Sequence, residues 1–312
     1  MSPAVRTLIV LLGLGLTACR QPSPLPTVVP GPLDGVRDVS LQDGFITVRL
    51  EIPTSPPGPK PAVISPIAER DLLLQSGAVV VTYQVHWEKL AALVPKSAPA
   101  PAPETAAPPA PKNTVGVWLL ASPTPATIGK GYFELIEGTA RHQISTVIDY
   151  LVTVPEIDPQ RIGIGGTSTN GFKALQLLAF DRRVAAAVIF SACGDYHCFL
   201  ERSNLAMNGT PLELDKKYET WLRQHEPIRH PRRFVHAAIL MVNGTEDQAV
   251  PYPCVERTES VFRRTYEAAG VPERFRTIAI PGGGHSLDDR ASQEAIAWWF
   301  RWLLPPGRPP GR

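Results

Sequence analysis

The feature that most constrains this chain is an alternation of short apolar runs with segments of helical spacing. Short apolar runs, of which 78–83 is rich in β-branched residues, predict strands, and they fall at 60–66, 78–83, 161–166, 184–190, 237–244 and 275–280. Between them, apolar residues recur at helical spacing, in 68–77, 132–154, 172–180, 258–270 and 289–304. This order predicts an α/β fold with a mostly parallel sheet covered by helices on both faces. A β-hairpin that turns at Asp43-Gly44 precedes it.

The N-terminal segment has the layout of an export signal. Arg6 is followed by a short apolar run that ends in Leu16-Thr17-Ala18-Cys19, which resembles a bacterial lipobox. We expect a signal peptide over 1–18, lipid attachment at Cys19 and a Pro-rich tether over 19–33. The protein would then be exported and anchored to a bacterial cell membrane, at the outer membrane or cell surface. An ordinary secretory signal with an incidental Cys is the alternative.

The segment from 34 to 304 is long enough for one large domain with its own core. A low-complexity Pro/Ala stretch at about 95–113 cannot pack a core, so we interpret it as a disordered surface insertion. A domain boundary at that point is the alternative, which the continuing alternation beyond it disfavours. A flexible tail is expected at 305–312. The net charge of +2 gives no electrostatic case for a nucleic-acid partner.

Ser168 lies in a turn between the strand 161–166 and the helix that follows. Gly166, two residues before it, lets the backbone turn tightly, and the helix that starts next to the Ser favours negative charge there. This context is the one a nucleophile elbow requires. Asn170 replaces the usual glycine two residues after the Ser. A phosphate-binding loop is disfavoured, because its Gly and Lys positions are absent.

A base and an orienting acid follow in the loops after two later strands. Asp247 follows the strand 237–244, and His285 follows the strand 275–280 behind three glycines. The order Ser, Asp, His, each after its own strand, is that of an α/β-hydrolase. Glu246 and Asp288 are nearby alternatives for the acid.

The segments around these three residues resemble the catalytic segments of α/β-hydrolases, nearest the dienelactone hydrolase-like and prolyl-oligopeptidase-like branch. The resemblance implies an α/β-hydrolase fold, with Ser168 as nucleophile, His285 as base and then acid, and Asp247 as the group that orients the base. It also implies two backbone donors for the oxyanion, at Thr169 and at Ile67.

A cap over the pocket is expected at about 193–235, because this polar stretch follows a strand at the same edge of the sheet. Trp87 and Tyr196 are candidate pocket walls, although either side chain could equally be packing. Cys193 or Cys198 is expected to pair with Cys254. The spacing of Cys and His matches no zinc pattern, so neither a metal nor an organic cofactor is predicted.

These features together predict a serine hydrolase that cleaves small-molecule or lipid-like carboxylic esters through an acyl-enzyme intermediate. A peptidase or thioesterase of the same fold is one alternative. A non-catalytic envelope protein that keeps the fold for binding is another. Acyl-chain length, physiological substrate and oligomeric state are not determined by the sequence.

Overall fold

A computed structural model gives the fold, and it describes residues 33–42, 44–66, 69–86, 132–134, 136–206, 216–286 and 289–304. The expected signal peptide, Cys19, Ile67, Trp87, the Pro/Ala insertion, the C-terminal tail and all of the tether except Leu33 lie outside these residues. Within them, no helix combines the length and the apolar character that crossing a bilayer requires.

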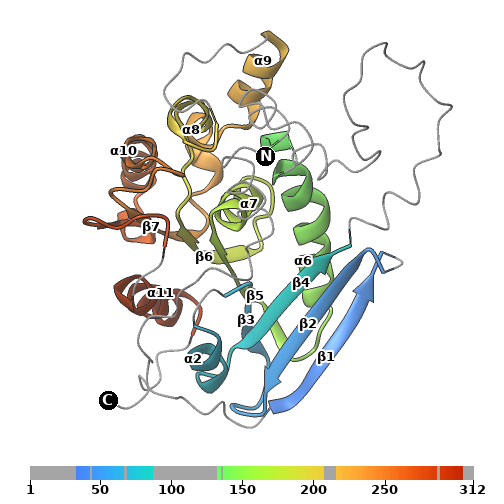
Figure 1. Cartoon of the computed structure of the whole chain (residues 1–312). Helices are drawn as coiled ribbons and strands as arrows, with labels where there is room; N and C mark the ends of the chain where they lie inside the picture. The colour runs from blue at the N-terminus through green and yellow to red at the C-terminus, as the bar shows by residue number, and fades with distance from the viewer. Residues whose placement is uncertain are drawn as a thin grey trace, which may run out of the picture.

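One mixed sheet of eight strands, in the order β1-β2-β4-β3-β5-β6-β7-β8, forms the centre of the described structure (Figure 1). Only the β1–β2 and β2–β4 pairs are antiparallel, and the other pairs are parallel. The predicted α/β-hydrolase fold with a mostly parallel sheet is therefore confirmed. The strands are β1 (Leu33–Leu41), β2 (Ile46–Pro53), β3 (Lys60–Ile64), β4 (Val79–Val85), β5 (Ile157–Thr167), β6 (Val184–Phe190), β7 (Ala238–Gly244) and β8 (Phe275–Ile280).

Helices cover both faces of this sheet. The longer elements are α2 (Arg70–Gln75), the π-helical turn η1 (Thr139–Ile144), α6 (Ser145–Leu151), α7 (Thr169–Leu178), α8 (Tyr196–Arg202), α9 (Lys216–His225), α10 (Tyr252–Ala268) and α11 (Asp289–Trp302). Three short 3-10 turns are η2 (Pro227–Arg229), η3 (Pro231–Arg233) and η4 (Pro272–Arg274). In Figure 1, α2 and α11 lie on the side of the sheet opposite α7.

Side chains that alternate along the strands build two separate apolar clusters. In β6, Ala187 and Ile189 join the cluster that includes side chains of α6, α7 and α10, whereas Ala186 and Val188 join the cluster of α2 and α11. This is the two-residue period of a strand buried on both faces. Residues at the carboxyl ends of the parallel strands consequently gather at one edge, which is where sites form in open α/β sheets.

The C-terminal helix packs through its tryptophans. Trp298 and Trp299 are 3% and 1% exposed and belong to the α2–α11 cluster. Trp302 is partly buried against the same cluster. The aromatic face of this helix thus serves the core.

Candidate active site

Ser168 lies in a tight turn between the end of β5 and the first residue of α7. Its backbone has φ 55° and ψ −122°, a conformation that costs a non-glycine residue about 1–3 kcal/mol and concentrates at functional sites. The turn is held because the Ser168 N–H donates to the Phe190 carbonyl oxygen at 3.0 Å. A Cβ on Gly166 would lie 2.3 Å from the Asn170 carbonyl oxygen, so glycine is required at that position.

The chain departs from the usual elbow at Asn170, and the structure shows why the turn still closes. The close approach of helix to strand falls on the next residue, Gly171. A Cβ there would lie 2.9 Å from the Phe190 carbonyl oxygen and 3.0 Å from the Ala192 side chain. Gly171 therefore provides the close packing of α7 on β6, while the Asn170 side chain is left exposed.

Asp247 and His285 are joined by a hydrogen bond across two neighbouring loops. The His285 Nδ1 lies 2.7 Å from the Asp247 Oδ2, and the Asp247 side chain is fully buried. The other carboxylate oxygen, Oδ1, accepts from the backbone N–H groups of Ala249 and Val250 at 2.8 and 2.9 Å. With both oxygens occupied, the carboxylate is fixed in one orientation.

This geometry distinguishes Asp247 from its neighbour Glu246. The Glu246 side chain is exposed and makes no described contact with His285, while Asp288 lies outside the described residues. Among the described acids, the partner of His285 is Asp247 alone.

The loops after β7 and β8 are tied to each other through their backbones. The Glu246 N–H donates to the Gly283 carbonyl oxygen at 2.8 Å, and the Thr245 N–H donates to the Ile280 carbonyl oxygen at 3.0 Å. A Cβ on Gly244 would lie 2.2 Å from the same Gly283 oxygen. Only glycine lets the two loops approach this closely, and the approach sets the distance from Asp247 to His285.

The second ring nitrogen of His285, Nε2, is buried and has no hydrogen-bond partner. The structure therefore brings Asp247 and His285 together but does not bond Ser168 to His285. Catalytic hydrogen bonds are often long in the absence of substrate. With Nδ1–H given to the carboxylate, Nε2 carries the lone pair that a general base needs.

Thr169 is the first residue of α7, so its backbone N–H has no acceptor within the helix. Its side chain is also anchored, because the Thr169 Oγ1 lies 3.0 Å from the Tyr132 hydroxyl. Tyr132 is largely buried, and burial raises its pKa, so the phenol stays neutral. Tyr132 is not among the predicted site residues, because nothing in the chain near it indicates a contact with the elbow.

Tyr196 does not line a pocket, which corrects the role considered from the sequence. Its side chain is completely buried, and its hydroxyl donates to the Gln176 Oε1 at 2.8 Å. Its ring stacks on Phe133 at 3.8 Å between centroids. Tyr196 is thus a packing residue between α8 and α7, because the segment after β6 turns back onto the core.

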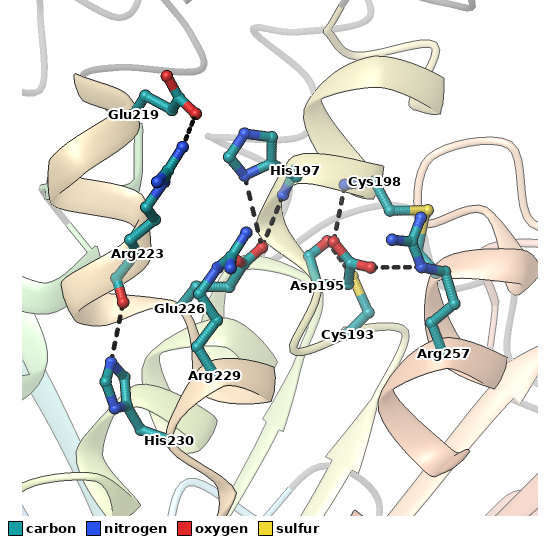
Figure 2. Close-up of polar contacts among 11 residues, drawn as sticks. Cys193, Asp195, His197, Cys198, Glu219, Arg223, Glu226, Arg229, His230 and Arg257 are labelled. Carbon is teal, nitrogen blue, oxygen red and sulfur yellow. Dashed lines mark hydrogen bonds and ion pairs between the residues drawn. A yellow bond between two sulfur atoms is a disulfide. The ribbon is translucent and has the colours of Figure 1, made fainter. Parts of the chain in front are cut away.

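The segment after β6 is fastened by a disulfide and by buried carboxylates (Figure 2). Cys198 of α8 is bonded to Cys254 of α10, and Cys193 is the free, buried thiol. Asp195 accepts from the Cys198 N–H at 2.9 Å and pairs with Arg257 of α10 at 2.8 Å.

A second carboxylate in the same view, that of Glu226, is fully buried. It accepts from the His197 N–H at 2.9 Å and from the Arg229 Nε at 2.7 Å. Burial raises its pKa. Together with the Asp195 pair, these contacts fix α8 and the turn after α9 against each other and against α10.

No group of three or more His, Cys, Asp or Glu side chains in the described part of the chain is arranged to hold a metal ion. The chemistry that the described residues offer at this edge of the sheet is that of a hydroxyl, an imidazole and a carboxylate. In serine hydrolases such a set carries out nucleophilic acyl transfer.

The chain is similar in sequence to known hydrolases. The family model described as "Prolyl oligopeptidase family" matches residues 134–305. A Bacillus subtilis (strain 168) protein named "Putative hydrolase YtaP" is 23% identical over 162 residues, which is 51% of this chain and 51% of that protein.

Two solved structures show the same fold. A puromycin-hydrolyzing peptidase of Mycobacterium tuberculosis matches with a TM-score of 0.56 and 16% identity, over 86% of this chain and 39% of that one. A "Putative Dienelactone Hydrolase" of Klebsiella pneumoniae matches with a TM-score of 0.50 and 15% identity, over 85% and 97%. The matched part therefore spans about half of the curated relative and less than half of the mycobacterial peptidase.

The fold and these matches place the chain in the α/β-hydrolase class. Within that class, the chain belongs to the prolyl oligopeptidase family, whose model covers more than half of it.

Proposed function

We propose that this protein hydrolyses carboxylic esters through an acyl-enzyme intermediate on Ser168. The observation that carries the proposal is the buried Asp247–His285 pair, whose free Nε2 faces no other described partner. Ser168, in a strained turn after the carboxyl end of β5, provides the nucleophile at the same edge of the sheet.

The proposed reaction follows from the roles of these three side chains. The Ser168 Oγ attacks the ester carbonyl carbon while the His285 Nε2 takes its proton, and Asp247 stabilises the imidazolium through Nδ1–H. The Thr169 N–H, with the backbone near Ile67, stabilises the oxyanion. His285 then protonates the departing alcohol, and a water activated by the same Nε2 releases the acid.

Esters are favoured as substrates on chemical grounds. An alkoxide or phenoxide leaves more readily than an amine, so a working Ser-His-Asp set cleaves esters even where its preferred bond is an amide. The resemblance to a dienelactone hydrolase over 97% of that protein's length supports ester chemistry, since a lactone is a cyclic ester.

Peptide or amide hydrolysis is the second candidate. The family name and the puromycin-hydrolyzing peptidase favour it. Aminoacyl p-nitroanilides, assayed beside the matching p-nitrophenyl esters, decide between the two, because a peptidase would turn over both and an esterase the esters alone.

We further propose export and anchoring through a lipid on Cys19, supported by the apolar run that precedes it. Metabolic labelling with an alkyne-bearing fatty acid should mark the wild-type chain. The Cys19→Ala chain should stay unlabelled, and equal labelling of both would contradict the anchor.

The test of the proposed activity is hydrolysis of p-nitrophenyl esters from acetate to palmitate by the chain that starts after Cys19, with Ser168→Ala as its pair. We expect turnover in the wild type and a loss of at least about 10³-fold in the variant. A folded wild type that hydrolyses no ester, and in which Ser168 resists a fluorophosphonate, would favour a non-catalytic binding protein.

A further inference from the structure

A polar hollow of about 240 Å³ lies beside the nucleophile turn. It is formed where the carboxyl ends of β3 and β4 meet the first turns of η1 and α7. Its lining includes Ser65, Tyr83, Thr139, Asn170 and Lys173.

Two of these residues connect the hollow to the reacting centre. Asn170 is the second residue after Ser168, and Ser65 begins the loop that carries the predicted oxyanion donor near Ile67. A Cβ on Gly165, near the end of β5, would lie 2.8 Å from the Ser65 carbonyl oxygen, so Ser65 lies directly against the nucleophile strand. A substrate held at Ser168 therefore has the hollow within reach.

Lys173 brings a cation into the hollow without a described carboxylate to neutralise it. Its Nζ donates to the Asn170 Oδ1 at 3.3 Å, a long and neutral contact. Burial lowers the pKa of Lys173 to about 8. Tyr83 is the other titratable group that lines the hollow, and burial raises its pKa, so it stays neutral beside the lysine.

Thr139 supplies an independent indication that the hollow can bind a ligand group. This residue is 1% exposed, lines the hollow, and has a buried Oγ1 with no hydrogen-bond partner. A buried hydroxyl without a partner is costly, by about 1–3 kcal/mol, and such groups in native structures call for an explanation. A ligand oxygen in the hollow would accept from it.

We propose that this hollow is a subsite for a carboxylate group of the substrate, bound by Lys173 with Thr139 and Asn170. The substrates would then be esters that carry an anionic group on the acyl or the alcohol side. A carboxylate fits because it accepts from the ammonium, the hydroxyl and the side-chain amide at once. The inference rests on the proposed function, because it places the subsite next to Ser168.

Two pairs of esters test the subsite, each pair differing in charge. On the acyl side, the p-nitrophenyl monoester of adipic acid is compared with p-nitrophenyl hexanoate. On the alcohol side, 4-carboxyphenyl butyrate is compared with 4-carbamoylphenyl butyrate. The quantity measured is the ratio of kcat/KM for the anionic ester to that for the neutral one.

We expect Lys173→Met to lower this ratio by about 10- to 100-fold in one of the two pairs, which assigns the side. Lys173→Arg should restore part of it. Lys217→Met, which removes an exposed lysine on α9, is the matched control and should leave the ratio unchanged. An unchanged ratio in both pairs for Lys173→Met overturns the proposal.

The pH dependence has a defined sign. The ammonium form of Lys173 is lost as pH rises through about 8, so kcat/KM for the anionic ester should fall above that pH in the wild type. The neutral partner ester should lack this limb, and so should both esters with Lys173→Met. A limb shared by the anionic and neutral esters would contradict a charge-binding role.

A direct measurement separates failure of the subsite from failure of the proposed activity. Acetylation of Lys173 by acetic anhydride, followed by peptide mass spectrometry, requires no turnover. Adipate should protect Lys173, whereas the neutral diamide of adipic acid should not. Protection in a chain that hydrolyses no ester would retain the subsite and reject the esterase, and equal acetylation with either additive would reject the subsite.

Discussion

Replacement of Asp247 by asparagine should lower kcat by about 10⁴-fold while leaving the fold intact. The Asp247 Oδ1 accepts two backbone N–H groups, from Ala249 and Val250, and an asparagine carbonyl can keep both. The loss therefore falls on Oδ2, whose 2.7 Å contact with the His285 Nδ1 becomes a contact with an NH₂ group. That group cannot accept Nδ1–H, so the imidazole is held in the wrong tautomer.

The magnitude follows from the role of this contact. The same replacement in a serine peptidase triad lowers kcat by about 10⁴-fold, which corresponds to about 5.4 kcal/mol of transition-state stabilisation. The free energy of unfolding should fall by only about 1–3 kcal/mol, since one charged hydrogen bond is lost from a buried site.

The assay is steady-state hydrolysis of p-nitrophenyl acetate, with a thermal melt of each variant. Glu246→Gln is the matched control, because it removes the same charge one residue earlier from an exposed side chain. It should keep kcat within about twofold, as surface changes usually do. If Asp247→Asn keeps more than a tenth of the activity, or if Glu246→Gln loses as much as Asp247→Asn, the assignment of the acid is refuted.

Two further predictions concern the loops after β7 and β8 and the disulfide between α8 and α10. Gly244→Ala should lower kcat/KM by at least about 10²-fold, because its Cβ would meet the Gly283 carbonyl oxygen and push the His285 loop away. The control is Gly284→Ala, whose Cβ meets nothing within 4 Å and which should stay active. Equal losses of kcat/KM in both variants would contradict this prediction. Removal of the Cys198–Cys254 bond with two serines should lower the free energy of unfolding by about 2–4 kcal/mol, since it closes a loop of sequence separation 56. Urea unfolding of the oxidised wild type and the double variant measures that difference, and coincident curves would show that the bond does not stabilise the fold.

The fold was predictable because its signals are local. Runs such as 184–190 are apolar along their whole length, which indicates a strand buried on both faces without knowledge of its neighbours. The order of the candidate residues, each after its own strand, also does not change if a predicted strand boundary is wrong by a residue or two. The described strands follow these runs closely.

The parts that depend on distant contacts were not predictable. Which of Glu246 and Asp247 meets His285 depends on the way two loops pack, and the choice between Cys193 and Cys198 depends on the start of α8. The sequence left the role of Tyr196 open, because a side chain after a strand can turn inward as easily as toward a pocket. The burial of Lys173, which lowers its pKa, arises from elements more than 80 residues apart in sequence.

The central claim is that Ser168 is the nucleophile and that the Asp247–His285 pair activates it. The most direct test is reaction of the chain with a fluorophosphonate, followed by mapping of the adduct by peptide mass spectrometry. The account predicts one adduct, on Ser168, formed at least about 10²-fold more slowly in His285→Ala. An adduct on another residue, or equal labelling rates with and without His285, would contradict it.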